Sequence, residues 1–301
     1  DTYGADAVRF GIMIASPAGN DLLFDESSLE QGRNFNNKLW NALKLVKMWE
    51  ERQQSSDGKR ETRNDFALHW FDNRLNEVKE EVDGLMKQFR LSEALKTVYS
   101  LIWDDFCSWY LEWVKPGFEQ PIDAAVYNKT VSFFEELMQL LHPFIPFITE
   151  EIYHHLREQK VDLCVTQYGA LKPAEKNILQ QGQLLKNVIS NLRDARNKNQ
   201  LKPKETIKLH IETADASSYK SIENILLKQV NAESVAYVNA PVAGSIVVAV
   251  EKDKFYIEAE KQLDNTALKT DLLKDLEHQK GFLQSVLKKL SNERFVQNAK
   301  P

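Results

Sequence analysis

The sequence predicts a mainly α-helical protein: an antiparallel helical bundle, then a small α/β domain and the start of a coiled-coil arm. Three observations lead to this fold class. All six tryptophans lie before residue 115, where apolar residues recur every three or four positions, as in amphipathic helices. Alternating β-branched segments occur only after residue 205. Leucines at a/d-like spacing then run from Leu263 to Leu290.

The first half of the chain predicts a series of long helices. The first runs from Ser27 to about Trp49, and QQSSDGKRETRND (53–65) then predicts a surface loop, because Gly, Ser and alternating charges interrupt the pattern. Further helices are expected at about residues 66–86, 92–114 and 122–157. Pro143 and Pro146 interrupt the last of these, so we expect a kink or a break there. Long amphipathic helices in succession indicate an antiparallel bundle.

The second half predicts a linker, a helix and a small sheet. Residues 161–174 have little periodicity, and a helix is expected over about 174–198. TIKLHIET (206–213) alternates apolar and polar residues, which is typical of a half-buried strand. A short helix near 219–228 is followed by the expected strands SVAYV, SIVVAV and KFYIEAE, with Asp253 in the turn between the last two.

Composition excludes several classes of protein. The 301 residues, 43% hydrophobic and 28% charged, suit a globular protein of two or more domains. A net charge of −5 argues against coating nucleic acid or membrane through bulk positive charge. No apolar run is long enough to span a bilayer. Two cysteines, Cys107 and Cys164, form no disulfide framework and fit a reducing cytoplasm. Because the chain begins at Asp1, we expect a piece of a longer protein.

The sequence predicts neither a catalytic site nor a metal site. Its isolated glycines fit no dinucleotide-binding or Walker pattern, and no nucleophile–base pair is visible. Glu151 and His154 form the Glu-x-x-His unit that di-iron bundles use twice. Only one copy is present, so a solvated helix face is the preferred interpretation. The histidines His142, His155 and His210 are expected to be structural.

Basic and aromatic residues interleave in the first two long helices. The stretch RNFNNKLWNA (33–42) is rich in amide and cationic donors, and HWFDNR (69–74) follows the charged loop. Aromatic faces stack on unpaired bases at about 1–3 kcal/mol per base, and Arg or Lys binds phosphate. In the alternative interpretation the aromatic residues belong to the bundle core and the Lys and Arg side chains extend into solvent. The pattern alone favours this alternative. Basic residues also gather in 186–204, where Arg193 and Arg196 could instead cap a helix or pair with Asp194 and Glu205. They gather again in the last helix, where an ordinary solvated face is the alternative.

Several motifs, in this order and spacing, resemble the C-terminal part of the valyl-tRNA synthetase family, within the class I aminoacyl-tRNA synthetases. YGADAVRFGIMIASPAGNDLLFD (3–25) resembles the segment after the family's KMSKS loop, and GRNFNNKLWNA (32–42) is typical of the valine enzymes. WYLEWVK (109–115) and LHPFIPFITEEIYHHL (141–156) are similar to motifs of the wider Val, Ile, Leu and Met group. NLRDARNKNQLKPKETIKLHI (191–211) and LKKLSNERFVQNAKP (287–301) again resemble the valine enzymes.

The resemblance implies a fragment of an ATP-dependent ligase that activates valine and transfers it to its tRNA during translation. The catalytic and editing sites would lie upstream, so the fragment is expected to be inactive alone and to hold no cofactor, whereas the parent would use Mg-bound ATP. Implied partners are valine tRNA and the upstream catalytic domain, in a cytoplasmic, monomeric parent without a membrane anchor. Asp6 and Arg9 are expected to brace the fold.

The resemblance also implies five segments and a set of tRNA contacts. The segments are a remnant of the stem-contact region (1–30), the anticodon-binding bundle (31–160), a linker and connecting helix (161–205), a small α/β domain (206–262) and the truncated coiled-coil arm (263–301). Implied anticodon contacts are Arg33, Asn37, Lys38, Trp40, His69, Trp70, Phe71 and Arg74. Implied backbone contacts are Arg193, Arg196, Lys288, Lys289 and Arg294. Trp70 resembles the family's base-stacking position, whereas His69 replaces an Arg of some relatives.

A non-catalytic helical module that binds other proteins is the alternative function. The leucine repeat of the last helix would then be a protein-binding coiled coil, a reading that also suits the acidic composition. It leaves the ordered run of synthetase-like motifs unexplained.

Overall fold

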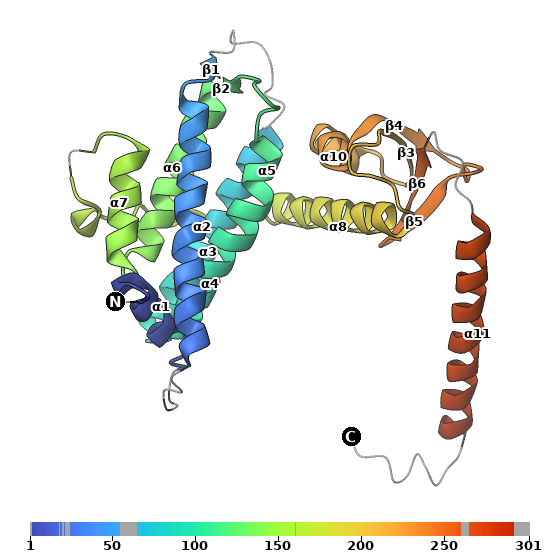
Figure 1. The fold of residues 1–301 in the computed structure, drawn as a ribbon, viewed down its shortest axis with the longest axis horizontal. Helices are drawn as coiled ribbons and strands as arrows, with labels where there is room; N and C mark the ends of the chain where they lie inside the picture. Colours follow the sequence, from blue (N-terminus) through green and yellow to red (C-terminus); the bar gives the residue numbers. More distant parts are fainter. Residues whose placement is uncertain are drawn as a thin grey trace.

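The computed structural model describes residues 2–17, 19, 21, 25–54, 65–159, 161–259 and 265–291. The fold is rich in helices, with two small sheets, as the sequence predicts. One group of helices lies side by side in the first part of the chain (Figure 1). It consists of α1 (Ala5–Ile14), α2 (Glu26–Glu50), α3 (Asp65–Lys87), α4 (Leu91–Ser100), η1 (Leu101–Tyr110), α5 (Leu111–Val114), α6 (Ala124–Leu141) and α7 (Pro146–Leu156).

Local sequence signals explain where several of these helices begin and end. Asp25 caps α2 by accepting a hydrogen bond from Ser27 N, and Asp123 caps α6 by accepting one from Ala125 N. The expected break at HPFIPF is confirmed, because α6 ends at Leu141 and α7 begins at Pro146. Proline is tolerated in a first helical turn, where its missing N–H has no intrahelical partner.

α1 is fixed to the α6–α7 junction by two charged side chains. Asp6 Oδ2 accepts a hydrogen bond of 2.6 Å from Ile148 N in the first turn of α7. Arg9 donates to the carbonyl oxygens of Phe144 and Pro143 at 3.0 and 3.2 Å. The bracing role expected for Asp6 and Arg9 is therefore confirmed.

Two features of the bundle differ from the sequence prediction. The single helix expected over 92–114 is continuous, but its middle section, η1, is a π-helix. Gln53 and Gln54, expected in a loop, form strand β1 (Gln53–Gln54), which pairs in parallel with β2 (Ile122–Asp123). The rest of that loop, residues 55–64, lies outside the described part of the chain.

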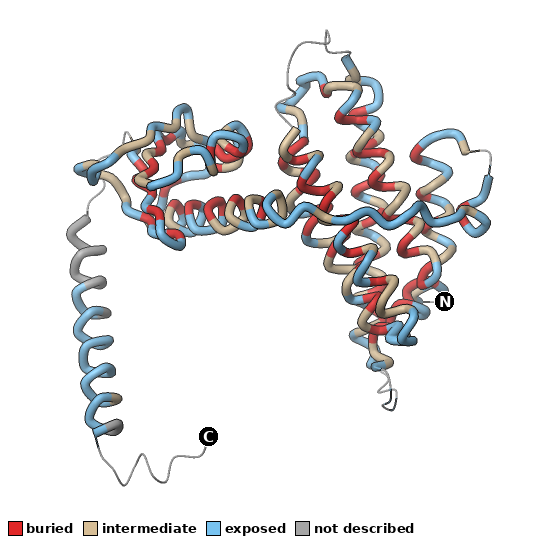
Figure 2. Tube along the Cα trace, turned by 180° about the vertical axis from the view of Figure 1, so that it is seen from behind, coloured by how far each residue is buried: buried red, intermediate tan, exposed pale blue. Residues whose placement is uncertain are grey.

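The core of the bundle is aromatic. Phe71 is fully buried and its ring lies 4.8–5.3 Å, centroid to centroid, from the rings of Tyr110, Phe133 and Phe106. Aromatic pairs of this kind add about 0.5–1.5 kcal/mol each beyond their buried area. In Figure 2 the buried residues follow the inward faces of the helices and continue into the next part of the chain.

A long helix, α8 (Lys176–Lys198), extends from the bundle to a small α/β unit (Figure 1). The short helix η2 (Leu163–Val165) precedes it in the chain. The unit contains β3 (Ile207–Glu212), α9 (Ser217–Lys220), α10 (Glu223–Val230), β4 (Ala232–Val238), β5 (Ile246–Val250) and β6 (Asp253–Ala259). The sheet order is β4-β3-β6-β5, with β3 and β4 parallel and the other neighbours antiparallel.

The predicted half-buried strand at 206–213 is confirmed, since Ile207, Leu209 and Ile211 of β3 are buried. The position expected for Asp253 is wrong. Asp253 is the first residue of β6, is 5% exposed, and accepts a hydrogen bond of 2.5 Å from the Tyr219 hydroxyl. The turn before it is formed by Glu251 and Lys252.

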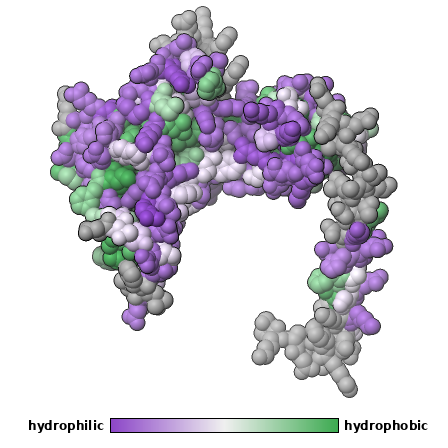
Figure 3. Space-filling model, viewed as in Figure 1, coloured by the Kyte–Doolittle hydropathy of each residue, from purple (hydrophilic) through white to green (hydrophobic). Residues whose placement is uncertain are grey.

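The last described helix is α11 (Asn265–Leu290), which extends away from the sheet (Figure 1). The side chains of Leu273, Leu276, Leu283 and Leu287 are 49–57% exposed. Figure 3 accordingly shows hydrophobic residues among the hydrophilic ones along this helix. Within the described residues, no helix combines the length and apolar character that crossing a membrane requires.

Candidate nucleic-acid interface

A buried carboxylate contacts side chains of α3 and α8. Asp105, in η1, is 5% exposed. Its Oδ2 accepts a hydrogen bond of 2.8 Å from Arg74 Nε in α3, and its Oδ1 accepts one from Lys186 Nζ in α8. Arg74 also pairs with Glu77 at 2.5 Å. Burial lowers the pKa of Arg74, but Asp105 and Glu77 raise it by more, so Arg74 stays charged.

A cavity of about 460 Å³ lies beside this network. Its wall combines cationic donors, acidic acceptors, amides and one aromatic ring: Trp70, Arg74, Glu77, Ser100, Asp105, Leu179, Gln180, Gln183 and Lys186. Side chains of these types can hydrogen-bond the polar edges of a nucleobase. The cavity is therefore a chemically suitable pocket for an unpaired base.

Trp70 and Phe71 lie in the core. Trp70 is 2% exposed; its ring centroid is 4.6 Å from that of Trp113, and Lys186 Nζ lies 4.6 Å above it. α8 packs so closely that a Cβ atom on Gly182 would lie 2.1 Å from Trp70 Cδ1. In this structure neither Trp70 nor Phe71 presents a free face to a base. Both rings belong to the bundle core, the alternative to base stacking that the sequence left open.

The other predicted anticodon contacts are divided between different surfaces. On α2, Arg33 pairs with Glu30 at 3.0 Å, and Lys38 Nζ lies 5.2 Å above the Trp103 ring. Asn37 and His69 are exposed. Trp40 lies edge-on to His155 of α7, whereas Trp70 faces α8. The structure thus brings Trp70 and Arg74 together at the cavity, and leaves the α2 residues apart from them.

The predicted backbone contacts also have different surroundings. Arg196 is 4% exposed and donates to the carbonyl oxygens of Val230, Lys202 and Glu205 at 2.6–2.8 Å. Arg193 is exposed and donates to Gln229 O and Oε1. Burial lowers the pKa of both guanidinium groups. Lys288 is exposed on α11, while the Lys289 side chain and Arg294 lie outside the described residues.

Sequence reasoning missed Asp105, Gln180 and Gln183 and did not assign Lys186 to this site. The one available signal was Asp105 itself, an acid inside the apolar stretch LIWDDFCSWY, where a buried charge needs a partner. The histidines of α7 also pair with acids four residues away, which the Glu-x-x-His spacing does not indicate. His154 pairs with Glu150 at 3.1 Å, and Glu151 pairs with His155 at 3.0 Å. On a helix, residues four apart face each other as readily as residues three apart.

The residues that line the cavity fall within a range that matches a known family. Residues 69–211 match the family model of the anticodon-binding domain of tRNA ligase. The chain is 42% identical over 301 residues to Valine--tRNA ligase of Phocaeicola vulgatus, covering 99% of this chain and 34% of that relative. It is 40% identical over 301 residues to the enzyme of Bacteroides fragilis, with the same coverages, and 30% identical over 309 residues to that of Clostridium acetobutylicum, covering 99% and 35%. The chain spans about a third of the length of these relatives.

Proposed function

Because this chain belongs to the valine--tRNA ligase family, of whose members it spans about a third, we propose that it is the tRNA-binding part of such an enzyme. The parent activates valine with Mg-bound ATP and transfers it to its tRNA. This part binds the anticodon region of valine tRNA and contacts the catalytic domain of the same chain. Alone it is catalytically inactive. The parent acts in the cytoplasm as a monomer.

The observation that carries the proposal is the match of residues 69–211 to an anticodon-binding domain. That range begins at His69 and includes Arg74, Glu77, Asp105 and Lys186, the four charged groups at the cavity. Anticodon bases are unpaired, so a protein can read their edges with charged and amide side chains. We propose that Arg74, Lys186 and the exposed His69 contact the anticodon loop, with Trp70 supporting the cavity wall.

Finer features of the fold belong to the same proposal. The first helices form an antiparallel bundle of the anticodon-binding type, and α11 is one helix of a coiled-coil arm along the tRNA. Its exposed leucines and the exposed Lys288 support this assignment, since one face is apolar and a cation is available for phosphate. On α2, the exposed Asn37 and the half-exposed Lys38 remain candidates for tRNA contact.

Equilibrium binding at several salt concentrations tests the proposal. The 301-residue chain should bind valine tRNA more tightly than an unrelated tRNA, and the affinity should fall steeply with salt because phosphate contacts release counterions. The matched control is the same valine tRNA with the anticodon loop of the unrelated tRNA. We expect this exchange to remove the preference, while the salt dependence is kept.

Equal affinity for all three RNAs, with a shallow salt slope, would contradict anticodon recognition. A preference that survives the exchange of the anticodon loop would place recognition elsewhere on the tRNA. If the chain bound none of the three RNAs, the alternative function, a module that binds other proteins, would be favoured.

A further inference from the structure

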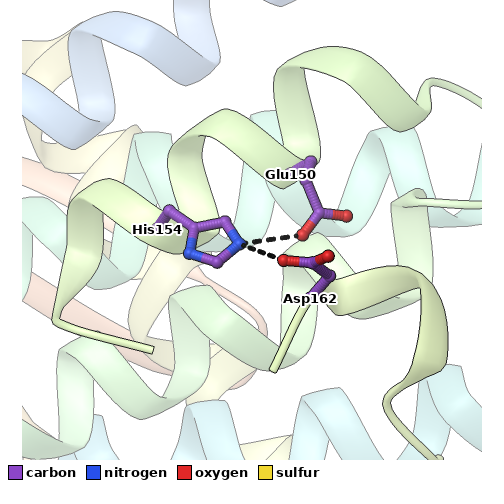
Figure 4. A group of neighbouring side chains, drawn as sticks. All are labelled: Glu150, His154 and Asp162. Carbon is purple, nitrogen blue, oxygen red and sulfur yellow. Dashed lines mark hydrogen bonds and ion pairs between the residues drawn. The ribbon is translucent and has the colours of Figure 1, made fainter. Parts of the chain in front are cut away.

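Three side-chain atoms that could bind a metal ion lie close together between α7 and the segment that follows it. Figure 4 shows Glu150 and His154 on α7 pointing toward Asp162, which immediately precedes η2. His154 Nε2 lies 3.1 Å from Glu150 Oε1 and 3.2 Å from Asp162 Oδ1. All three atoms lie within 4.8 Å of one another.

One ring nitrogen cannot satisfy both carboxylates equally well through hydrogen bonding. Nε2 carries at most one hydrogen, and a hydrogen bond weakens as its angle departs from linearity. Two carboxylates at this separation also repel each other. In the part of the chain that the structure describes, the ion pairs of Glu150 and Asp162 are with histidines. A divalent cation between the three atoms would match the two negative charges and use the imidazole lone pair.

We propose that Glu150, His154 and Asp162 bind one zinc ion. Zinc–nitrogen and zinc–oxygen bonds of about 2.0–2.1 Å place neighbouring tetrahedral ligands about 3.3 Å apart. The two distances from His154 Nε2, 3.1 and 3.2 Å, are close to that edge length. Glu150 and His154 are four residues apart, the spacing that places two ligands on one helix face in known zinc motifs. Water completes the fourth position.

Neighbouring groups hold Glu150 in this orientation. Its Oε1 accepts a hydrogen bond of 2.6 Å from Leu163 N, and its Oε2 lies 3.8 Å from His142 Nε2. The other ring nitrogen of His142 lies 2.9 Å from Thr149 Oγ1. Outer contacts of this kind orient metal ligands and increase their affinity.

The zinc ion would act structurally and not in catalysis. It would connect α7 to the 161–165 segment, which starts the connection to α8. That connection is held further along by Gln139, which donates to Gln167 O at 2.9 Å and accepts from the Tyr168 hydroxyl at 2.8 Å. Metal binding would therefore stabilise the start of the connector against the bundle.

Titration of the metal-free 301-residue chain with zinc sulfate near neutral pH tests the site. Calorimetry should show one saturable ion per chain, and the melting temperature should rise with zinc. His154→Gln and Asp162→Asn should each weaken binding at least about tenfold. Cobalt should give the visible absorption of a tetrahedral site.

The neighbouring pair provides a matched control. His155 and Glu151 have the same spacing on the same helix, with His155 Nε2 3.0 Å from Glu151 Oε1, but they belong to no three-ligand group among the described residues. His155→Gln should leave zinc affinity unchanged. The proposal is overturned if the unaltered chain shows no saturable binding, if His155→Gln weakens binding as much as His154→Gln, or if Asp162→Asn has no effect.

Discussion

Arg193 and Arg196 lie three residues apart on α8, yet their guanidinium groups have different roles in the fold. Arg196 donates to four backbone carbonyls, those of Lys202, Pro203, Glu205 and Val230, at the start of the α/β unit. A buried guanidinium with its donors used in this way is a structural group. Arg193 is exposed and can exchange its contact with Gln229 for another acceptor at small cost.

Replacing these two arginines should therefore change stability unequally. Arg196→Met leaves buried carbonyls without donors, so the free energy of unfolding should fall by about 2–3 kcal/mol. Arg193→Met, the matched control, should lower it by less than about 1 kcal/mol. Urea denaturation of the two variants measures both values. Equal losses would contradict the structural role of Arg196.

The two cysteines should differ in reactivity. Cys107 is 8% exposed, and burial raises the pKa of its thiol to about 12, whereas Cys164 is exposed. Because the thiolate is the reactive form, Cys107 stays protonated and inaccessible at mildly alkaline pH. A thiol-specific chromogenic reagent should label one cysteine in the native chain and two in denaturant. Cys164→Ser should abolish the native reaction.

At the scale of elements, the contact between α3 and α8 depends on one glycine. Gly182 lets the backbone of α8 approach the Trp70 ring, and no larger residue fits unless the indole or one of the helices moves. Gly84, on α3 itself, has no heavy atom within 4 Å of the position of an added Cβ atom. An added methyl group would therefore clash at Gly182 but would meet open space at Gly84.

Alanine at these two positions should have effects of opposite sign. Gly182→Ala should lower the free energy of unfolding by about 1–3 kcal/mol through overpacking, whereas Gly84→Ala should raise it by up to about 1 kcal/mol through helix propensity. A double-mutant cycle with Trp70→Ala gives the decisive measurement. If Trp70 is the obstacle, Gly182→Ala should cost much less in the Trp70→Ala background. An unchanged cost would place the clash elsewhere.

Elements determined by local patterns could be predicted, and elements that depend on distant contacts could not. The break between α6 and α7 follows from two prolines, and β3 follows from strict alternation. The β1–β2 pair joins residues almost 70 positions apart, so no local pattern indicates it. The π-helical section Leu101–Tyr110 likewise has no signal in local helix propensity.

For the whole molecule, the same distinction applies to the candidate site. Trp70 and Arg74 came from a local motif, and both line the cavity. Asp105 and Lys186 come from two other helices and are 81 positions apart, so only the fold shows that they meet. Through the resemblance, the sequence could suggest tRNA as the partner that we propose. It could not tell which aromatic rings are buried or which cations already hold the fold together.

The shared carboxylate of Asp105 has a geometric consequence. Gly182 and Lys186 lie one turn apart on α8, the first against Trp70 and the second on Asp105. A slide of α8 by one turn, about 5.4 Å, would drive a side chain into the indole and separate the buried ion pair at the same time. Intermediate positions satisfy neither contact. The two contacts therefore allow only one position of α8 along its axis. That position also fixes the direction in which α8 extends toward the α/β unit.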